Sequence, residues 1–264
     1  MTAIFASFDI GILNFSQYVE EVNLNVLESL EKEYKALPKT LQRKTQGPMN
    51  NKIQNILDRV ELSGRRIHTG VYDFSANPDG ILDIGTRLNL LYHLEKYKYL
   101  WDKCDGFIIE EQYNPSGGNK KQNGKPNTKA IKVAEGVLMW ILMTYPDRII
   151  TTFKSTFKTQ IFGAPKMTKT ERKKWSTAEV HKLYTKREDV DMVNVYNFAI
   201  QFKGKRVPKT LEKLDAIQNQ CICVSEDAKE LRDKIIIEKQ KMDDVSDACK
   251  QFQAYKFKTM VACF

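Results

Sequence analysis

The amino-acid sequence predicts an α/β fold, because short apolar segments alternate with longer segments whose apolar residues recur at helical spacing. The expected strands are residues 3–9, 15–22, 66–75, 104–112 and 147–153, of which the first two form a hairpin. The expected helices are residues 24–37, 53–62, 84–101, 128–145, 169–186, 211–237 and 241–257. Two strands and the last helix carry carboxylates at their ends. The 264 residues suit one large domain with elaborations.

The first carboxylate ends the first strand. Residues 3–9 (AIFASFD) form a short apolar run of the kind found in a strand buried on both faces. Burying Asp9 is costly unless it meets a cation or a metal ion. Gly11 follows closely and lets the backbone turn sharply or approach a phosphate. The structural alternative is that Asp9 only caps this turn.

The second acidic pair ends another apolar strand, within residues 104–112 (CDGFIIEEQ). Side chains alternate along a strand, so only one of Glu110 and Glu111 can lie on the same face as Asp9. We choose Glu110, which directly follows the apolar pair. The alternative is a solvated pair of glutamates at the end of a strand.

The last helix supplies two further carboxylates. Asp243 is a natural N-cap residue. Asp244 and Asp247 are three residues apart, so on a helix they share one face and repel each other unless a cation lies between them. Together with the two acids at the strand ends, they form an oxygen-rich set that suits Mg²⁺ or Mn²⁺. Two such ions activate a water and stabilise the leaving oxygen in phosphodiester cleavage.

The charge of the chain points to a polyanionic partner, nucleic acid first, because its formal net charge is +9. Residues 114–129 form a lysine-rich loop that either clamps a phosphate backbone or is simply solvated. Residues 154–213 mix basic and aromatic side chains, and we expect most of these aromatics to belong to the core. The candidate contacts to nucleic acid are Lys120, Lys121, Lys125, Lys154 and Lys158, the last two neutralising a phosphate.

Other classes of protein are disfavoured by composition. No apolar run reaches the ~18 residues of a membrane span, and the N-terminus has no basic leader. The five cysteines include no C-x-x-C pair and there are three histidines, so we expect reduced thiols in an intracellular protein and no zinc site.

The order of three motifs resembles the Holliday junction resolvases of poxviruses and other large DNA viruses, relatives of bacterial RuvC. The motifs are a strand with Asp-x-Gly (residues 3–11), a strand with Ile-Ile-Glu-x-Gln (residues 104–112) and Asp-Asp-Val-x-Asp-Ala (residues 243–248). The resemblance implies a ribonuclease H-like fold, a mixed five-stranded sheet flanked by helices. It also implies a homodimer through helix 128–145 and two Mg²⁺ or Mn²⁺ ions per active site. The implied catalytic and metal-binding acids are Asp9, Glu110, Asp244 and Asp247.

The activity implied by this resemblance is resolution of four-way DNA junctions by paired symmetric nicks, in DNA recombination and repair. The implied location is the host cytoplasm or a viral factory. The whole chain, 1–264, would be one RuvC-like nuclease domain. Residues 23–64 look like an insertion, and residues 166–239 like an extended basic helical region that is longer than expected over 186–239.

Two alternatives remain open from the sequence. One is a catalytically silent protein that binds junctions but does not cut them, against which the full set of four acids argues. The other is an ATPase of the actin and sugar-kinase superfamily, whose phosphate loop also follows a strand with Asp-x-Gly. That family expects a second glycine-rich loop after such a strand, whereas Gly117 and Gly118 lie in the lysine-rich loop.

Overall fold

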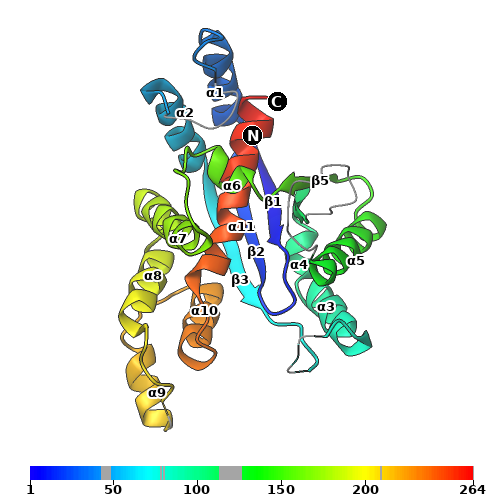
Figure 1. Cartoon of the computed structure of the whole chain (residues 1–264), viewed down its shortest axis with the longest axis vertical. Coiled ribbons are helices and arrows are strands. Elements are labelled where there is room, and N and C mark those ends of the chain that lie inside the picture. The colour runs from blue at the N-terminus through cyan, green and yellow to red at the C-terminus, as the bar shows by residue number, and fades with distance from the viewer. Residues whose placement is uncertain (43–48, 78, 80, 113–126, 209, 264) are drawn as a thin grey trace.

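The fold is built on a five-stranded, mixed, open sheet (Figure 1). We describe it from a computed structural model that covers residues 1–42, 49–77, 79, 81–112, 127–208 and 210–263. The strands are β1 (Thr2–Asp9), β2 (Phe15–Asn23), β3 (Gly64–Tyr72), β4 (Gly106–Glu111) and β5 (Ile149–Lys154). Their order is β3-β2-β1-β4-β5. The first three are antiparallel neighbours, whereas β4 runs parallel to β1 and β5 parallel to β4.

Helices cover both faces of the sheet. One face packs against α3 (Ile84–Lys96), α4 (Lys98–Trp101) and α5 (Thr128–Thr144). The other packs against α11 (Met242–Tyr255), which lies over β1 and β2 (Figure 1). The remaining elements are α1 (Leu24–Ala36), α2 (Asn51–Leu62), α6 (Phe157–Gln160), α7 (Lys169–Lys186), α8 (Val190–Phe202), α9 (Leu211–Gln218), α10 (Glu226–Ile237) and the π-helix η1 (Lys256–Val261). The predicted α/β class is confirmed.

Alternation along the central strands divides the core into two layers. Phe5 of β1 and Ile108 of β4 belong to the layer under α11. Phe8 and Ile109, at positions of the other parity, belong to the layer under α3, α4 and α5. Because successive side chains of a strand point to opposite faces, this pattern fixes the side on which each following residue lies.

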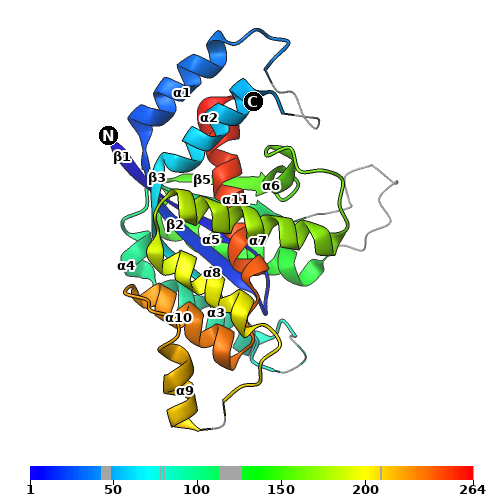
Figure 2. The same ribbon diagram turned by 90° about the vertical axis from the view of Figure 1, so that its left-hand side faces the viewer.

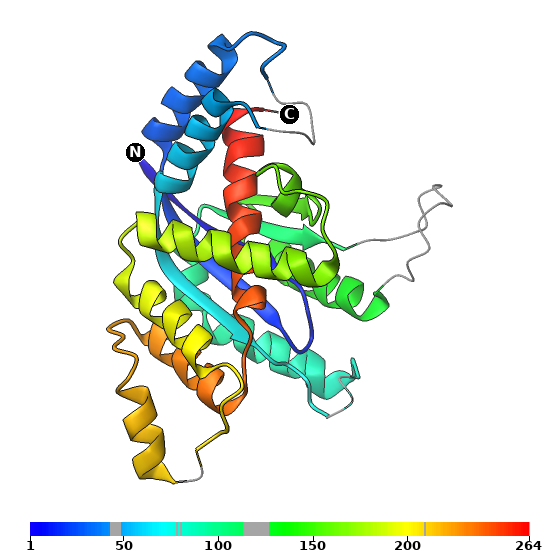
Figure 3. The same cartoon turned by 60° about the vertical axis from the view of Figure 1, so that its left-hand side comes forward.

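Two segments carry the elaborations. Between β2 and β3, α1 and α2 pack against each other and against η1 at the C-terminal end of the chain, as Figure 2 shows at the top of the molecule. Between α6 and α11 lie α7, α8, α9 and α10, with α7 crossing α11 (Figure 3). These two segments coincide with the regions predicted to be elaborations, 23–64 and 166–239. Whether they are insertions relative to a family core stays a prediction.

The structure corrects three expectations about helices. The predicted helix 211–237 is in fact two, α9 and α10, separated by residues 219–225. The backbone N–H groups of Val224 and Ser225 donate to the Asp191 side chain instead of continuing a helix. The helix predicted over 84–101 divides at Tyr97 into α3 and α4, and α8 was not expected. No helix in the described ranges has both the length and the apolarity needed to cross a membrane.

Candidate active site at the carboxyl ends of β1 and β4

Asp9 and Glu110 lie side by side on the α11 face of the sheet. β1 and β4 are parallel, with Phe8 opposite Ile109, so their carboxyl ends meet at one edge. A buried ammonium group joins them: Lys158 Nζ lies 2.5 Å from Asp9 Oδ1 and 2.9 Å from Glu110 Oε1. The structure therefore brings Glu110, the residue chosen from the sequence, next to Asp9. Glu111 is exposed on the strand's other side.

The turn after β1 is tight and explains the glycine in the Asp-x-Gly motif. A Cβ atom on Gly11 would lie 2.9 Å from the backbone oxygen of Asn14, closer than real Cβ contacts permit. The chain consequently reverses directly into β2, and Asp9 pairs with Ser16 in the antiparallel ladder.

Hydrogen bonds fix α11 against this end of the sheet. The Ser16 hydroxyl donates to the backbone oxygen of Asp244 at 2.7 Å. About two turns further along the helix, Gln251 Nε2 donates to Ser7 Oγ at 3.1 Å and to the backbone oxygen of Phe8 at 3.0 Å. The N-terminal turn of α11, which carries the acidic residues, is thereby held beside the end of β1.

The carboxylates of α11 face α7 as well as the sheet. Ser176 of α7 donates to Asp247 Oδ1 at 3.0 Å. Lys173, also on α7, forms an ion pair with Asp243 and lies 3.7 Å from Asp244 Oδ1. The expected N-cap role of Asp243 is wrong. Lys241 is the N-cap residue, its side chain makes no capping hydrogen bond, and Asp243 lies in the first turn, where it pairs with Lys173.

Asp9 and Glu110 titrate as a pair whose members are shifted in opposite directions. Burial raises the pKa of Asp9 well above its ordinary value, and Lys158 only partly offsets this, while Glu110 and Asp247 raise it further. Burial also opposes ionisation of Glu110, but Lys158 and the hydrogen bond with Asp9 outweigh it and lower the pKa of Glu110. Asp247 thus acts electrostatically on Asp9, which links the acids of α11 to the pair at the strand ends.

Asp244, the fourth acid, also carries an unfavourable charge. Burial, followed by repulsion from Asp243 and Asp247, raises the pKa of Asp244 to about 6 against the opposing effect of Lys173. Conversely, Asp9 and Glu110 outweigh the burial of Lys158 and raise its pKa. Carboxylates therefore outnumber the ammonium groups that contact them, and the site favours additional positive charge.

The donor set fits a divalent cation in its chemistry but not in its present spacing. Carboxylate oxygens are the ligands that Mg²⁺ and Mn²⁺ prefer. In the part of the chain that the structure describes, however, no three His, Cys, Asp or Glu side chains are grouped closely enough to hold an ion. The Lys158 ammonium group instead lies between Asp9 and Glu110.

The lysines predicted to contact nucleic acid lie in different environments. Lys158 is in the site, although it contacts carboxylates and not solvent. Lys154 is exposed at the end of β5, in register with Glu111 and not with Glu110. The others lie outside the described residues: Lys120, Lys121 and Lys125. Sequence reasoning missed Lys173 and Ser176, whose spacing of three places them on one face of α7 but could not show which residues that face contacts.

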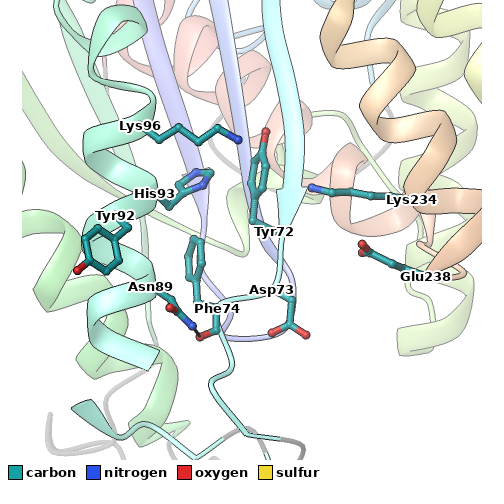
Figure 4. Close-up of a pocket in the computed structure, with 9 residues that line it drawn as sticks. All are labelled: Tyr72, Asp73, Phe74, Asn89, Tyr92, His93, Lys96, Lys234 and Glu238. Carbon is teal, nitrogen blue, oxygen red and sulfur yellow. Dashed lines mark hydrogen bonds between the residues drawn. The ribbon is translucent and has the colours of Figure 1, made fainter. Parts of the chain in front are cut away.

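A separate pocket of about 310 Å³ lies between the end of β3, α3 and α10 (Figure 4). Tyr72 and His93 line it, with their ring centres 4.1 Å apart. Lys234 enters from α10 and lies 3.8 Å from the centre of the Tyr72 ring. None of the four predicted acids lines this pocket, so it is distinct from the carboxylate site.

Comparison with known proteins adds one relative. The chain is 25% identical over 200 residues to uncharacterized protein 97L of Invertebrate iridescent virus 3, covering 69% of this chain and 86% of that protein. No protein-family model matches the chain, and no solved structure matches it. The relative is itself uncharacterized.

Proposed function

We propose that this protein is a metal-dependent, structure-selective endodeoxyribonuclease with a ribonuclease H-like fold, which resolves four-way DNA junctions by paired nicks. One observation carries the proposal: Asp9 and Glu110, from the ends of two parallel central strands, lie beside the acidic first turn of a helix packed on the same face. The strand order and directions are compatible with that fold.

The residues of the site have distinct roles in this proposal. Asp9, Glu110, Asp244 and Asp247 would hold two Mg²⁺ or Mn²⁺ ions. When bound, such ions activate water and stabilise the leaving oxygen of a phosphodiester. Because the Lys158 ammonium group now lies between Asp9 and Glu110, binding of an ion requires this group to withdraw from them. Lys158 is then free to contact the scissile phosphate, the role expected of it from the sequence.

The surface next to the site supports a DNA substrate. The first two turns of α7 expose the basic side chains of Lys169 and Arg172, which are three residues apart and therefore lie on one side of the helix. The same turns carry Lys173, which contacts Asp243. A duplex lying along this part of α7 would therefore meet cations for its phosphates while one strand approaches the carboxylates. Phosphate contacts of this kind read the shape of a junction more than its base sequence.

The exposed side of α5 supports the proposed homodimer. α5 buries Val133, Val137 and Ile141 against the sheet. On its opposite side Met139 and Met143 are 56% and 80% exposed. Exposed apolar side chains gathered on one helix are typical of a protein interface. A dimer through α5 would place two sites for symmetric cleavage of one junction.

The experiment that tests the proposal uses a labelled four-way DNA junction with Mg²⁺ or Mn²⁺. Wild-type protein is compared with Asp244→Asn, and Glu111→Gln serves as a matched control because Glu111 lies on the opposite side of β4 from Glu110. We expect paired symmetric nicks from the wild type and the control, and tight binding without nicks from Asp244→Asn. A linear duplex of the same sequence should remain uncut.

A silent junction-binding protein is the second candidate, and two observations favour it. Lys158 already satisfies Asp9 and Glu110, and the described acids are not spaced to hold an ion. Strong junction binding by the wild type with no nicks in either metal would support this candidate. Absence of both binding and nicks would contradict both candidates, and nucleotide binding would then revive the ATPase alternative.

A further inference from the structure

Two cysteines outside the carboxylate site lie next to each other in the connection between α9 and α10. Cys221 Sγ and Cys223 Sγ are 3.5 Å apart. Cys221 is buried, whereas Cys223 is partly exposed and can meet a small reagent from solvent. The remaining cysteines are two buried thiols and one exposed thiol: Cys104, Cys249 and Cys263.

The surrounding structure holds this pair in place from both sides. Arg232 of α10 donates to the backbone oxygen of Cys221 at 3.4 Å. Asn194 of α8 donates to the backbone oxygen of Ile222 at 2.8 Å. After the pair, Asp191 accepts from the backbone N–H groups of Val224 at 2.8 Å and Ser225 at 2.7 Å. The thiols are therefore kept together by contacts to two helices and not by the local chain alone.

The two thiols differ in the way that thiol oxidation requires. The hydrogen bond from Cys221 lowers the pKa of Cys223, while the same contact, together with burial, raises the pKa of Cys221. A thiolate is the nucleophile in such reactions. The Cys223 sulfur is thus the one that attacks an oxidant, and the Cys221 sulfur is placed to form a disulfide with the oxidised Cys223.

We propose that Cys221 and Cys223 form a redox-sensitive dithiol, which a hydroperoxide converts to an intramolecular disulfide. The Cys223 thiolate attacks one oxygen of the hydroperoxide, forming an S–O bond and breaking the O–O bond. The product is a sulfenic acid, and the other oxygen leaves as hydroxide or alkoxide. The Cys221 sulfur then attacks Cys223, forms the S–S bond and displaces the hydroxyl, which takes the Cys221 proton and leaves as water. Both sulfurs are oxidised and the peroxide is reduced.

The disulfide would reversibly restrict the conformation of the connection between α9 and α10. A disulfide brings the sulfur atoms to about 2.05 Å, so the two side chains must approach further while the flanking contacts hold the backbone. A dithiol reductant restores the starting state by thiol–disulfide exchange. This inference is independent of the proposed nuclease activity.

The test treats the full-length protein with hydrogen peroxide and follows it by intact mass, alkylation and peptide mapping. We expect a loss of about 2 Da and protection of Cys221 and Cys223 from alkylation, both reversed by dithiothreitol. In Cys221→Ser, Cys223 should be trapped as a sulfenic acid by dimedone, and Cys223→Ser should give no disulfide. Cys263→Ser, which changes the exposed distant thiol, is the matched control and should behave as wild type.

Other products would overturn the proposal. Wild-type protein that gains oxygen on Cys223 without forming the 221–223 bond shows that the pair does not close. Oxidation first at Cys263, or disulfide-linked dimers, shows that another thiol is the more reactive. Mapping of the wild type supplies this answer even where a serine variant folds poorly.

Discussion

Two groups of charged residues on the same face of the sheet show opposite balances of charge. The first surrounds Glu20 of β2, which is fully buried. Arg187 donates to both of its carboxylate oxygens at 2.8 and 3.0 Å, and Lys256 Nζ lies 2.6 Å away. Gln253 adds a further hydrogen bond at 2.8 Å. We call these four residues the Glu20 group.

The second group is the carboxylate site, where the side chains of Asp9 and Glu110 are 16% and 12% exposed. In the Glu20 group two cations serve one carboxylate. Arg187 and Lys256 outweigh the effect of burial and lower the pKa of Glu20 to about 2. In the carboxylate site acids are in excess, and the pKa of Asp9 and that of Asp244 are raised. Similar residue types thus form a closed structural unit in one place and an electrostatically incomplete site in the other.

The largest effect on stability is expected from Glu20→Gln. The amide leaves Arg187 and Lys256 buried without a counter-charge, and breaking a buried pair in this way costs about 3–5 kcal/mol. Urea unfolding should show a clearly lower midpoint at pH 7. An unchanged midpoint would mean that the Glu20 group does not differ from the carboxylate site as argued.

Asp9→Asn should have the converse effect, on activity and not on stability. Removing one oxyanion-hole donor costs about 10²–10³-fold in rate, and we use this order of magnitude for the loss of one metal-binding carboxylate. We expect a loss of that order in single-turnover junction cleavage, with an unfolding midpoint no lower than that of wild type. Cleavage at the wild-type rate would remove Asp9 from the mechanism. A large loss of stability would make it a structural residue, like Glu20.

The meeting of Asp9 with Glu110 was predictable, although the two residues are far apart in the chain, because each lies at the end of an apolar strand. Parallel strands bring their carboxyl ends to one edge, and alternation selects Glu110 over Glu111. The contacts of Lys158 and Lys173 were not predictable, because they depend on how α6 and α7 pack, which no pattern along the chain indicates. The division of 211–237 into α9 and α10 was missed for the same reason, since the Asp191 side chain takes the backbone N–H groups of Val224 and Ser225.

Lys158→Met removes a cation from the carboxylate site. Without the ammonium group, Asp9 and Glu110 repel each other, so we expect a lower unfolding midpoint in EDTA. We also expect tighter Mn²⁺ binding, by about tenfold, since relief of one competing contact worth about 1.4 kcal/mol changes affinity by that factor. Isothermal titration calorimetry or electron paramagnetic resonance of Mn²⁺ measures this affinity without any cleavage reaction. Lys256→Met, the matched change in the Glu20 group, should lose stability with no gain in metal affinity.

The smallest effect is a difference in the pH dependence of stability. The pKa of Glu20 is lowered, so its contribution is complete above its unfolded value of about 4.5 and is lost as the pH falls towards about 2. The pKa of Asp244 is raised to about 6, so as the pH falls this carboxylate is protonated in the folded state before it is protonated in the unfolded state. The destabilising contribution that Asp244 makes at pH 7 therefore diminishes as the pH falls from about 6 to about 3.8.

Asp244→Asn in EDTA tests whether Asp244 and Glu20 affect the pH dependence of stability in opposite directions. It removes an unfavourable charge at pH 7, where we expect a gain of about 1–2 kcal/mol in the free energy of unfolding, and little change at pH 4. Urea titrations of wild type and variant at pH 7, 5.5 and 4 measure the difference. A variant less stable than wild type at pH 7 would show that neighbouring cations already compensate the charge of Asp244. The excess of negative charge on which the proposed metal site depends would then be smaller than the contacts indicate.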